Sequence, residues 1–129
     1  MSAGPGRLPY VVSVEHVRRL CLSLPRTTEH LVRDRVKFRV GRLVYVAFSR
    51  DETQMGFGFP KELRPALVDG DPDTFLMPRI SDLRYNWVEA RLDPLDVEEM
   101  TELVTDAWVM CVPQFLAREY FGRLGRPGT

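Results

Sequence analysis

Basic and apolar residues alternate from Arg35 to Val40, and this period of two predicts a β-strand with one polar face. Alternate side chains on a strand project about 6.6–7 Å apart, which is similar to the spacing of phosphates along a strand of nucleic acid. We therefore expect a basic row on one face of a sheet, formed by Arg33, Arg35, Lys37 and Arg39 and extended by Arg42 in the adjoining turn.

Two interpretations of this basic row are open. It could hold a phosphate backbone, with Tyr85 and Trp87 supplying stacking surfaces on the same open sheet face. Alternatively, it is a solvated strand face whose charges pair with Glu89 and other acids across the sheet.

The overall charge argues against a strong polyanion binder, because 18 basic and 18 acidic residues give a net charge of zero. The charges are unevenly distributed, however. Residues 1–50 hold ten bases and three acids, a balance of +7, and residues 51–129 hold eight bases and fifteen acids, a balance of −7. Such halves can create a local basic surface, and they can equally cancel where they pack together.

Other groups of polar residues do not indicate catalysis or metal binding. The segment Thr27–His30 crowds hydroxyls, a carboxylate and an imidazole together, but catalytic partners usually come from distant positions. A turn role fits the threonines better, and Glu29 could tie this segment to a nearby arginine. The two histidines and two cysteines lack paired ligand spacing, so we expect no metal and no cofactor. The acids of the helix near residue 100 are typical of a solvated helix face.

The glycines and cysteines suit structural roles. Gly56 and Gly58 lack the strand-to-helix context of a nucleotide-binding loop, and they predict close packing of a helix on the sheet. Cys21 and Cys111 each fall on the apolar stripe of an expected helix. Both are therefore predicted to be reduced, largely buried thiols.

Several elements must position the basic row. Ser13 can cap a helix over Val14–Leu24, which Pro25 ends. Residues 26–34 are polar and loop-like, and three strands should follow at 36–40, 43–48 and 53–59. A short helix from about 61 to Gly70, a brief edge strand at 75–77 and a strand at 86–92 come next. The clearest element is a helix over residues 97–112, capped by Asp96 with Glu99, and Pro113 opens a last helix through Phe121.

The turns between the strands are too short for crossover helices, so the sheet should be mostly antiparallel. The amphipathic helices must bury their apolar stripes, and one sheet face is the natural target. We therefore expect one α+β domain over residues 13–121, a two-layer sandwich with helices on one face. Residues 1–12 should form a flexible arm and residues 122–129 a flexible tail, and the protein is expected in the cytoplasm because no signal-peptide or membrane-spanning apolar run occurs.

Four segments form a series along the chain: the helix end Leu24-Pro25 followed by Thr27-Thr28-Glu29, the hairpin 38–44, the tryptophan-containing strand 86–93, and an acidic helix with Ala107-Trp108. In order and spacing this series resembles the MmcQ/YjbR family over about residues 13–118. The resemblance implies a CyaY-like (frataxin-like) sandwich and a DNA-binding label, which rests largely on fold analogy. Many members carry a Lys-x-x-Pro-like segment after the third strand. This chain has Gly58-Phe59-Pro60-Lys61 there, where Lys61 would fill the basic position.

The sequence thus indicates a non-catalytic domain whose role it does not establish, and one hypothesis is that the domain binds DNA or RNA through the basic row, Lys61, Trp87 and an open sheet face. The alternative is an adaptor for a protein or a small ligand, without affinity for nucleic acid. An enzyme ranks third, because the chain shows no convergent set of nucleophile, base and electrophile.

Overall fold

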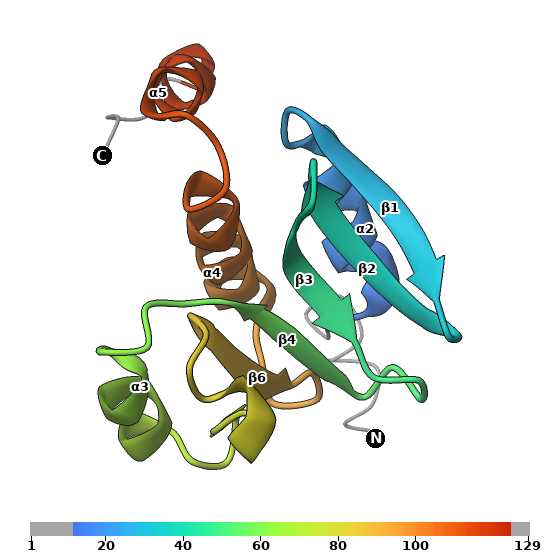
Figure 1. The fold of residues 1–129 in the computed structure, drawn as a ribbon, viewed down its shortest axis with the longest axis vertical. Coiled ribbons are helices and arrows are strands. Elements are labelled where there is room, and N and C mark those ends of the chain that lie inside the picture. Colours follow the sequence, from blue (N-terminus) through green and yellow to red (C-terminus); the bar gives the residue numbers. More distant parts are fainter. Residues whose placement is uncertain (1–11, 125–129) are drawn as a thin grey trace, which may run out of the picture.

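The computed structural model describes residues 12–124, in which six strands form one antiparallel sheet in the order β1-β2-β3-β4-β6-β5 (Figure 1). The expected meander is confirmed, because β2 (Arg35–Val40), β3 (Leu43–Phe48) and β4 (Gln54–Gly58) pair as consecutive neighbours. The strand β6 (Trp87–Arg91) pairs with β4 on one side and with the short β5 (Phe75–Leu76) on the other. The sheet therefore ends at β1 and at β5.

The segment expected to be a loop at residues 26–34 contains a strand instead. β1 (Thr27–Val32) pairs along its full length with β2, from Thr27 opposite Val40 to Val32 opposite Arg35. The turn that joins them has Arg33 and Asp34 at positive φ (52° and 65°), a conformation that few non-glycine residues adopt. The prediction was wrong because β1 is an edge strand whose burial does not alternate, so it lacks the period-two pattern of a half-buried strand.

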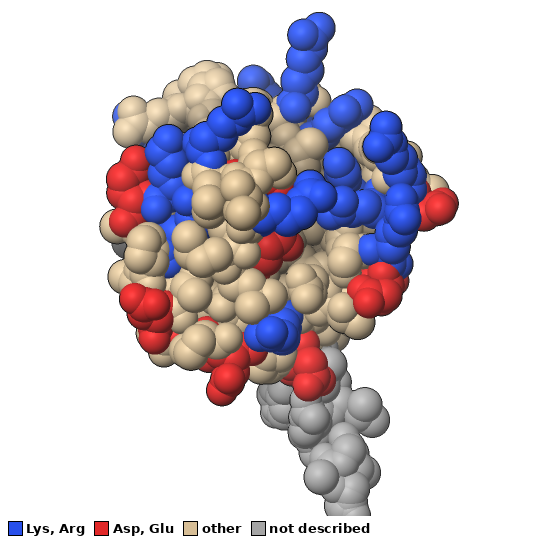
Figure 2. All heavy atoms as spheres, turned by 60° about the horizontal axis from the view of Figure 1, so that its bottom comes forward, with Lys and Arg blue, Asp and Glu red and all other residues tan. Residues whose placement is uncertain are grey.

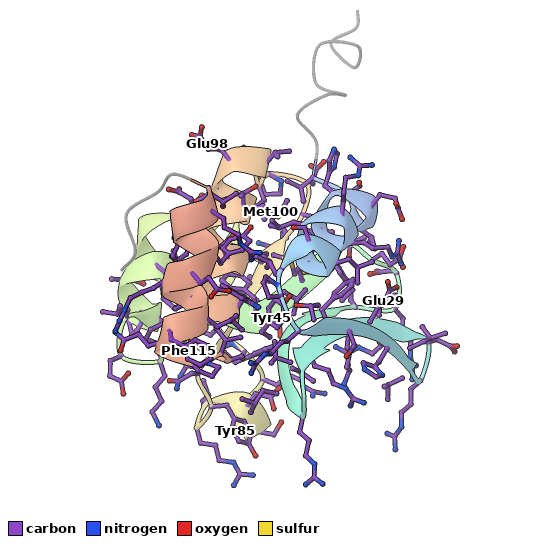
Figure 3. All side chains as sticks on the ribbon, turned by 90° about the horizontal axis from the view of Figure 1, so that it is seen from above. Glu29, Tyr45, Tyr85, Glu98, Met100 and Phe115 are labelled. Carbon is purple, nitrogen blue, oxygen red and sulfur yellow. The ribbon has the colours of Figure 1, made fainter. Side chains whose placement is uncertain are left out.

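The two main helices pack side by side on one face of the sheet, as expected (Figures 1 and 3). α2 (Val14–Ser23) is capped by Ser13, whose hydroxyl accepts from the backbone N–H of His16. α4 (Val97–Val109) begins at Asp96, whose carboxylate accepts from the backbone N–H of Glu99 at 2.7 Å. Buried side chains of both helices, Val17, Cys21, Met100, Val104 and Trp108, meet the apolar side chains of the sheet in one core. Within residues 12–124, neither α2 nor α4 covers the opposite face of the sheet.

A bulge in β3 places one additional side chain, that of Tyr45, in the core. Phe38 lies opposite Val46 and Arg39 opposite Val44, so Tyr45 has no partner on β2. Tyr45 is fully buried, and its hydroxyl lies 2.6 Å from the hydroxyl oxygen of Thr27 on the edge strand. The bulge therefore directs a polar aromatic side chain into the core, where it hydrogen-bonds to β1.

The smaller elements follow the sequence expectations with shifted ends. α3 (Arg64–Gly70) has Pro65 in its first turn, and η2 (Ile80–Asp82) is a single 3₁₀ turn before β6. α5 (Gln114–Arg123) runs two residues beyond Phe121, where we expected the tail to begin, and Val12 of the expected arm is buried in the core. Most of the predicted arm (1–11) and tail (125–129) lies outside the described residues. No helix within residues 12–124 is long and apolar enough to cross a membrane.

The two cysteines differ in burial. Both are free thiols; Cys21 is fully buried, whereas Cys111 is only partly buried. α4 ends at Val109, three residues before the expected end, so Cys111 lies in the turn that precedes Pro113. The residue before a proline disfavours helical geometry, which accounts for the shorter helix and for the more accessible thiol.

Candidate functional site

The basic row lies along the sheet face that the helices leave uncovered. Arg35, Lys37 and Arg39 of β2 alternate with buried Val36 and Phe38, so they project away from α2 and α4. Arg33 and Arg42 occupy the turns at the two ends of β2, and Gly41 supplies the positive φ (59°) of the second turn. Figure 3 shows basic side chains extending from the side of the sheet opposite the helices, and Figure 2 shows Lys and Arg gathered across this surface.

No member of the basic row forms an ion pair within residues 12–124. Within residues 12–124, the ion pairs join Arg18 to Glu15, Arg18 to Glu29 and Arg79 to Asp82, and none includes a member of the row. The expected tie from Glu29 is confirmed, because Nη2 of Arg18 on α2 lies 3.0 Å from Oε2 of Glu29 on β1. No ion pair joins the row to Glu89 within the described residues, although the positive charge of Arg35 does act on this carboxyl.

Ala47 lies in the floor of a hollow between β2 and β6, and Gly56 lies beneath the side chains of Trp87 and Glu89. Register places Ala47 of β3 and Gly56 of β4 side by side between Lys37 and Glu89. Strands lie about 4.8 Å apart, so β2 and β6 stand roughly 14 Å from each other across this floor. Longer side chains rise on both sides, and a concave surface results.

The hollow has two adjoining parts that share Arg35, Arg79 and Glu89. One part, of about 370 Å³, is also lined by Lys37, Val44, Ala47, Asp82, Tyr85, Asn86 and Trp87. The other, of about 650 Å³, is also lined by Ser49, Arg50, Asp51, Gln54, Leu76 and Met77. Both volumes fall in the range of about 300–1,000 Å³ that is usual for small-molecule sites.

Glu89 is the acidic centre of this basic surface. Its Oε2 accepts a hydrogen bond from the indole Nε1 of Trp87 at 2.9 Å. Burial raises the pKa of the Glu89 carboxyl, while the hydrogen bond from Trp87 and the positive charges of Arg35 and Arg79 oppose that rise. The carboxylate keeps further lone pairs that can accept from a ligand.

The guanidinium of Arg35 is anchored by one hydrogen bond, and its terminal nitrogens remain available to a ligand. Its Nε donates to the carbonyl oxygen of Phe48 at 3.0 Å, which fixes the guanidinium at the edge of the hollow. Its terminal nitrogens form no hydrogen bond with any other residue of the described range. The hollow thus combines guanidinium donors with the carboxylates of Glu89, Asp82 and Asp51, a set that suits a polar ligand carrying both hydrogen-bonding types.

A buried arginine supports the wall of the hollow. Arg64, at the start of α3, is 6% exposed, and its terminal nitrogens donate to the carbonyl oxygens of Leu83, Tyr85 and Trp87 at 2.8–3.1 Å. The wall segment 83–87 has little regular structure of its own. Arg64 therefore acts as a positioning residue for the two aromatic side chains.

Lys61 contacts the same wall segment rather than joining the basic row. Its backbone N–H donates to Oδ1 of Asn86 at 3.0 Å, and its ammonium donates to the carbonyl oxygen of Arg84 at 3.1 Å. Trp87 is partly buried and hydrogen-bonded, whereas Tyr85 is 51% exposed, with the guanidinium of Arg84 4.8 Å from its ring centre. Of the two aromatic residues considered from the sequence, Tyr85 is the more accessible.

Sequence reasoning did not identify three residues of this site. Arg79 and Arg64 stand outside any periodic pattern, and Glu89 was considered only as a counter-charge for the basic row. The only signal for Glu89 was its position on the polar side of a strand that also carries Trp87. No group of three or more His, Cys, Asp or Glu within residues 12–124 could hold a metal ion.

Comparisons with known proteins identify relatives of the fold. A family model described as YjbR matches residues 22–110. The structure is similar to the crystal structure of the Deinococcus radiodurans protein DR2400, which is described with the domain DUF419, at 20% identity and a TM-score of 0.70 over 92% of each chain. No curated protein matches the sequence. The resemblance noted in the sequence is thus confirmed over most of its length, and the chain belongs to the YjbR family.

Proposed function

We propose that the protein binds single-stranded nucleic acid across the open face of its sheet. In this proposal, the basic row contacts the phosphate backbone and the hollow beside it receives bases. The observation that carries the proposal is the row itself: three cationic residues project from one strand on the face opposite α2 and α4, two more lie in the turns at its ends, and none of the five is ion-paired within the described residues. Unpaired cations of this kind release counterions when they neutralise phosphates.

Single strands suit this surface better than a duplex. A hollow with an exposed aromatic ring can accept an unstacked base, whereas the bases of a duplex are already stacked and paired. The zero net charge of the chain limits the long-range attraction, so we expect moderate affinity that is greatest at low salt.

The direct test is a salt titration of binding. Fluorescence anisotropy of a labelled single-stranded oligonucleotide would be followed from 50 to 300 mM salt for the wild type and for Arg35→Ala/Lys37→Ala/Arg39→Ala. If each residue neutralises one phosphate, the log–log slope should flatten by about two units, because the slope is roughly −0.7 per phosphate for single strands.

A matched control removes three positive charges elsewhere. Arg19, Arg118 and Arg123 are exposed on α2 and α5, and their triple alanine variant has the same net charge as the β2 variant. It should keep most of the wild-type slope, and circular dichroism should verify that both variants are folded. Equal slopes for the wild type and the β2 variant, or no binding at 50 mM salt, would contradict the proposal.

A protein or small-ligand adaptor is the second candidate function, and one feature favours it. Ile80 is 89% exposed and Met77 is 45% exposed, and Met77 lines the larger part of the hollow. Exposed apolar side chains beside a polar hollow are typical of interaction sites. Retained folding without nucleic-acid binding in the salt titration would make this the leading function.

A further inference from the structure

We propose that the hollow between Arg35 and Glu89 is a pocket for an unstacked guanine base of the bound strand. This inference rests on the proposed function and adds base preference to it. Four features of the hollow support it: its acceptor, its donor, its aromatic wall and its floor.

The acceptor side is the Glu89 carboxylate. Only part of its acceptor capacity is used by the indole of Trp87, through one hydrogen bond of 2.9 Å to Oε2. Guanine carries two neighbouring donors, N1–H and the N2 amino group, on its Watson–Crick edge. A carboxylate accepts two such parallel donors, as it does from a guanidinium. Thymine offers a single N–H on the corresponding edge, so it would leave the partly buried carboxylate less completely paired.

The donor side is the Arg35 guanidinium. Its Nε is anchored on the carbonyl oxygen of Phe48, which orients the terminal nitrogens without consuming them. Arginine commonly donates two hydrogen bonds to O6 and N7 of guanine. These two atoms adjoin the edge that carries N1–H, so one base can contact Glu89 and Arg35 together. Cytosine and adenine each match only part of this arrangement.

The walls and floor suit a flat ring. Ala47 keeps the floor low, and Trp87 and Tyr85 line the same part of the hollow. Figure 3 places the Tyr85 label on the side of the sheet opposite the helices, in the region of η2. Bases commonly stack on such aromatic side chains when they leave a helix. The volume of about 370 Å³ is sufficient for one base with its bridging waters.

The experiment compares single bases in a constant background. Eleven-residue oligothymidylate would be titrated against the same oligonucleotide with one central guanine, since an isolated guanine cannot form quadruplexes. We expect the guanine oligonucleotide to bind roughly 5- to 100-fold more tightly, as for one well-formed bidentate contact. Inosine, which lacks the N2 amino group, and 7-deazaguanine, which lacks N7, should each lose most of this preference.

The variant that isolates the acceptor is Glu89→Gln. Its amide oxygen can still accept from Trp87, but it offers a donor where guanine also donates. The preference for guanine should fall to less than twofold, and the affinity for oligothymidylate should increase, because a negative charge is removed beside the basic row. Glu102→Gln makes the same chemical change on the exposed face of α4 and should keep the full guanine preference.

Each outcome decides between the two proposals. Equal affinity of the wild type for both oligonucleotides, or a guanine preference that survives Glu89→Gln, overturns the pocket and leaves the proposed function in place. No binding of either oligonucleotide at 50 mM salt overturns both. Loss of the preference in Glu89→Gln with oligothymidylate binding intact supports both.

Discussion

The indole Nε1 of Trp87 donates to Oε2 of Glu89 at 2.9 Å, and this hydrogen-bonded pair lies directly over Gly56. A Cβ at position 56 would approach Trp87 Nε1 to 2.6 Å and Glu89 Oε2 to 2.8 Å. The sequence predicted that Gly56 and Gly58 allow a helix to pack closely. A Cβ at position 58 would lie at an ordinary contact distance of 3.6 Å from the Cβ of Ala107 on α4. Gly56 instead makes room for the side chains of Trp87 and Glu89 on the open face.

Gly56→Ala should therefore displace the indole or the carboxylate and destabilise the protein. We expect a loss of about 1–3 kcal/mol in the free energy of unfolding, as for an overpacked core position, measured by urea denaturation. Gly122→Ala is the control, because nothing lies within 4 Å of a Cβ at that position in α5. It should be neutral or stabilising by up to about 1 kcal/mol. Equal stability of Gly56→Ala and the wild type would contradict the close approach.

The free energy of unfolding should depend on pH through the titration of Glu89. Burial raises its folded-state pKa above the ordinary value of 4.5, so the folded state holds the proton more tightly than the unfolded state. The stability that this carboxyl contributes is complete below its ordinary pKa and is lost as the pH rises through the folded pKa. Wild type should thus lose stability relative to Glu89→Gln as the pH rises above 4.5.

Denaturant unfolding of both proteins at several pH values would measure this difference. Glu99, whose pKa is also raised by burial, and Asp51, whose pKa is lowered by hydrogen bonds from Thr53, are present in both proteins. Their contributions cancel in the comparison. A constant difference across the pH range would show that the Glu89 carboxyl titrates as in the unfolded chain.

Tyr85 and Trp87 should differ in what their removal changes. Tyr85→Ala should weaken single-stranded binding by about 1–3 kcal/mol if a base stacks there, with little effect on stability, because the residue is 51% exposed. Trp87→Ala should weaken both binding and folding, since it also removes the hydrogen bond to Glu89. Phe115→Ala is the control for loss of an aromatic ring, because Phe115 is 60% exposed on α5. Unchanged binding by Tyr85→Ala would exclude stacking at this residue.

Arg64 should be important for the wall of the hollow. Arg64→Met keeps much of the side-chain volume but leaves the carbonyl oxygens of residues 83, 85 and 87 without their donors. We expect a loss of roughly 2–4 kcal/mol in unfolding free energy and weaker oligonucleotide binding. Arg91→Met, which removes one exposed hydrogen bond to the carbonyl of Asp73, should change stability by less than about 0.5 kcal/mol. Similar stabilities for the two variants would refute this role.

The two thiols should react at different rates with an aromatic disulfide reagent at pH 8. Burial raises the pKa of Cys21 to about 12, and the thiolate is the reactive form. Cys111 is only partly buried, so it should react first, and Cys21 should react only when the domain opens. Cys111→Ser should remove the faster phase. A fast phase that persists in this variant would place Cys21 nearer the surface.

Local patterns were sufficient to predict most of the elements. Alternation from Arg35 to Val40 predicted β2 and its polar face, and the apolar stripe from Val97 to Trp108 predicted α4 and its buried side. These predictions succeeded because side chains that face a core must repeat with the period of their own element. The caps at Ser13 and Asp96 were also predictable from the sequence, because a side-chain oxygen at the first position of a helix accepts from a free backbone N–H of the first turn.

Only the tertiary structure decided what lies around the basic row. β1 is held in the sheet by its hydrogen bonds to β2. Its own sequence has no alternation of apolar and polar residues from which a strand could be predicted. Arg35 and Glu89 are 54 positions apart, and they border one hollow because β6 pairs with β4 and leaves β5 at the edge. Strand order is set by the packing of the whole sheet beneath α2 and α4. The sequence by itself therefore determined the basic face and the buried helix stripes, while the carboxylate, guanidinium and aromatic groups of the hollow were brought together by long-range pairing.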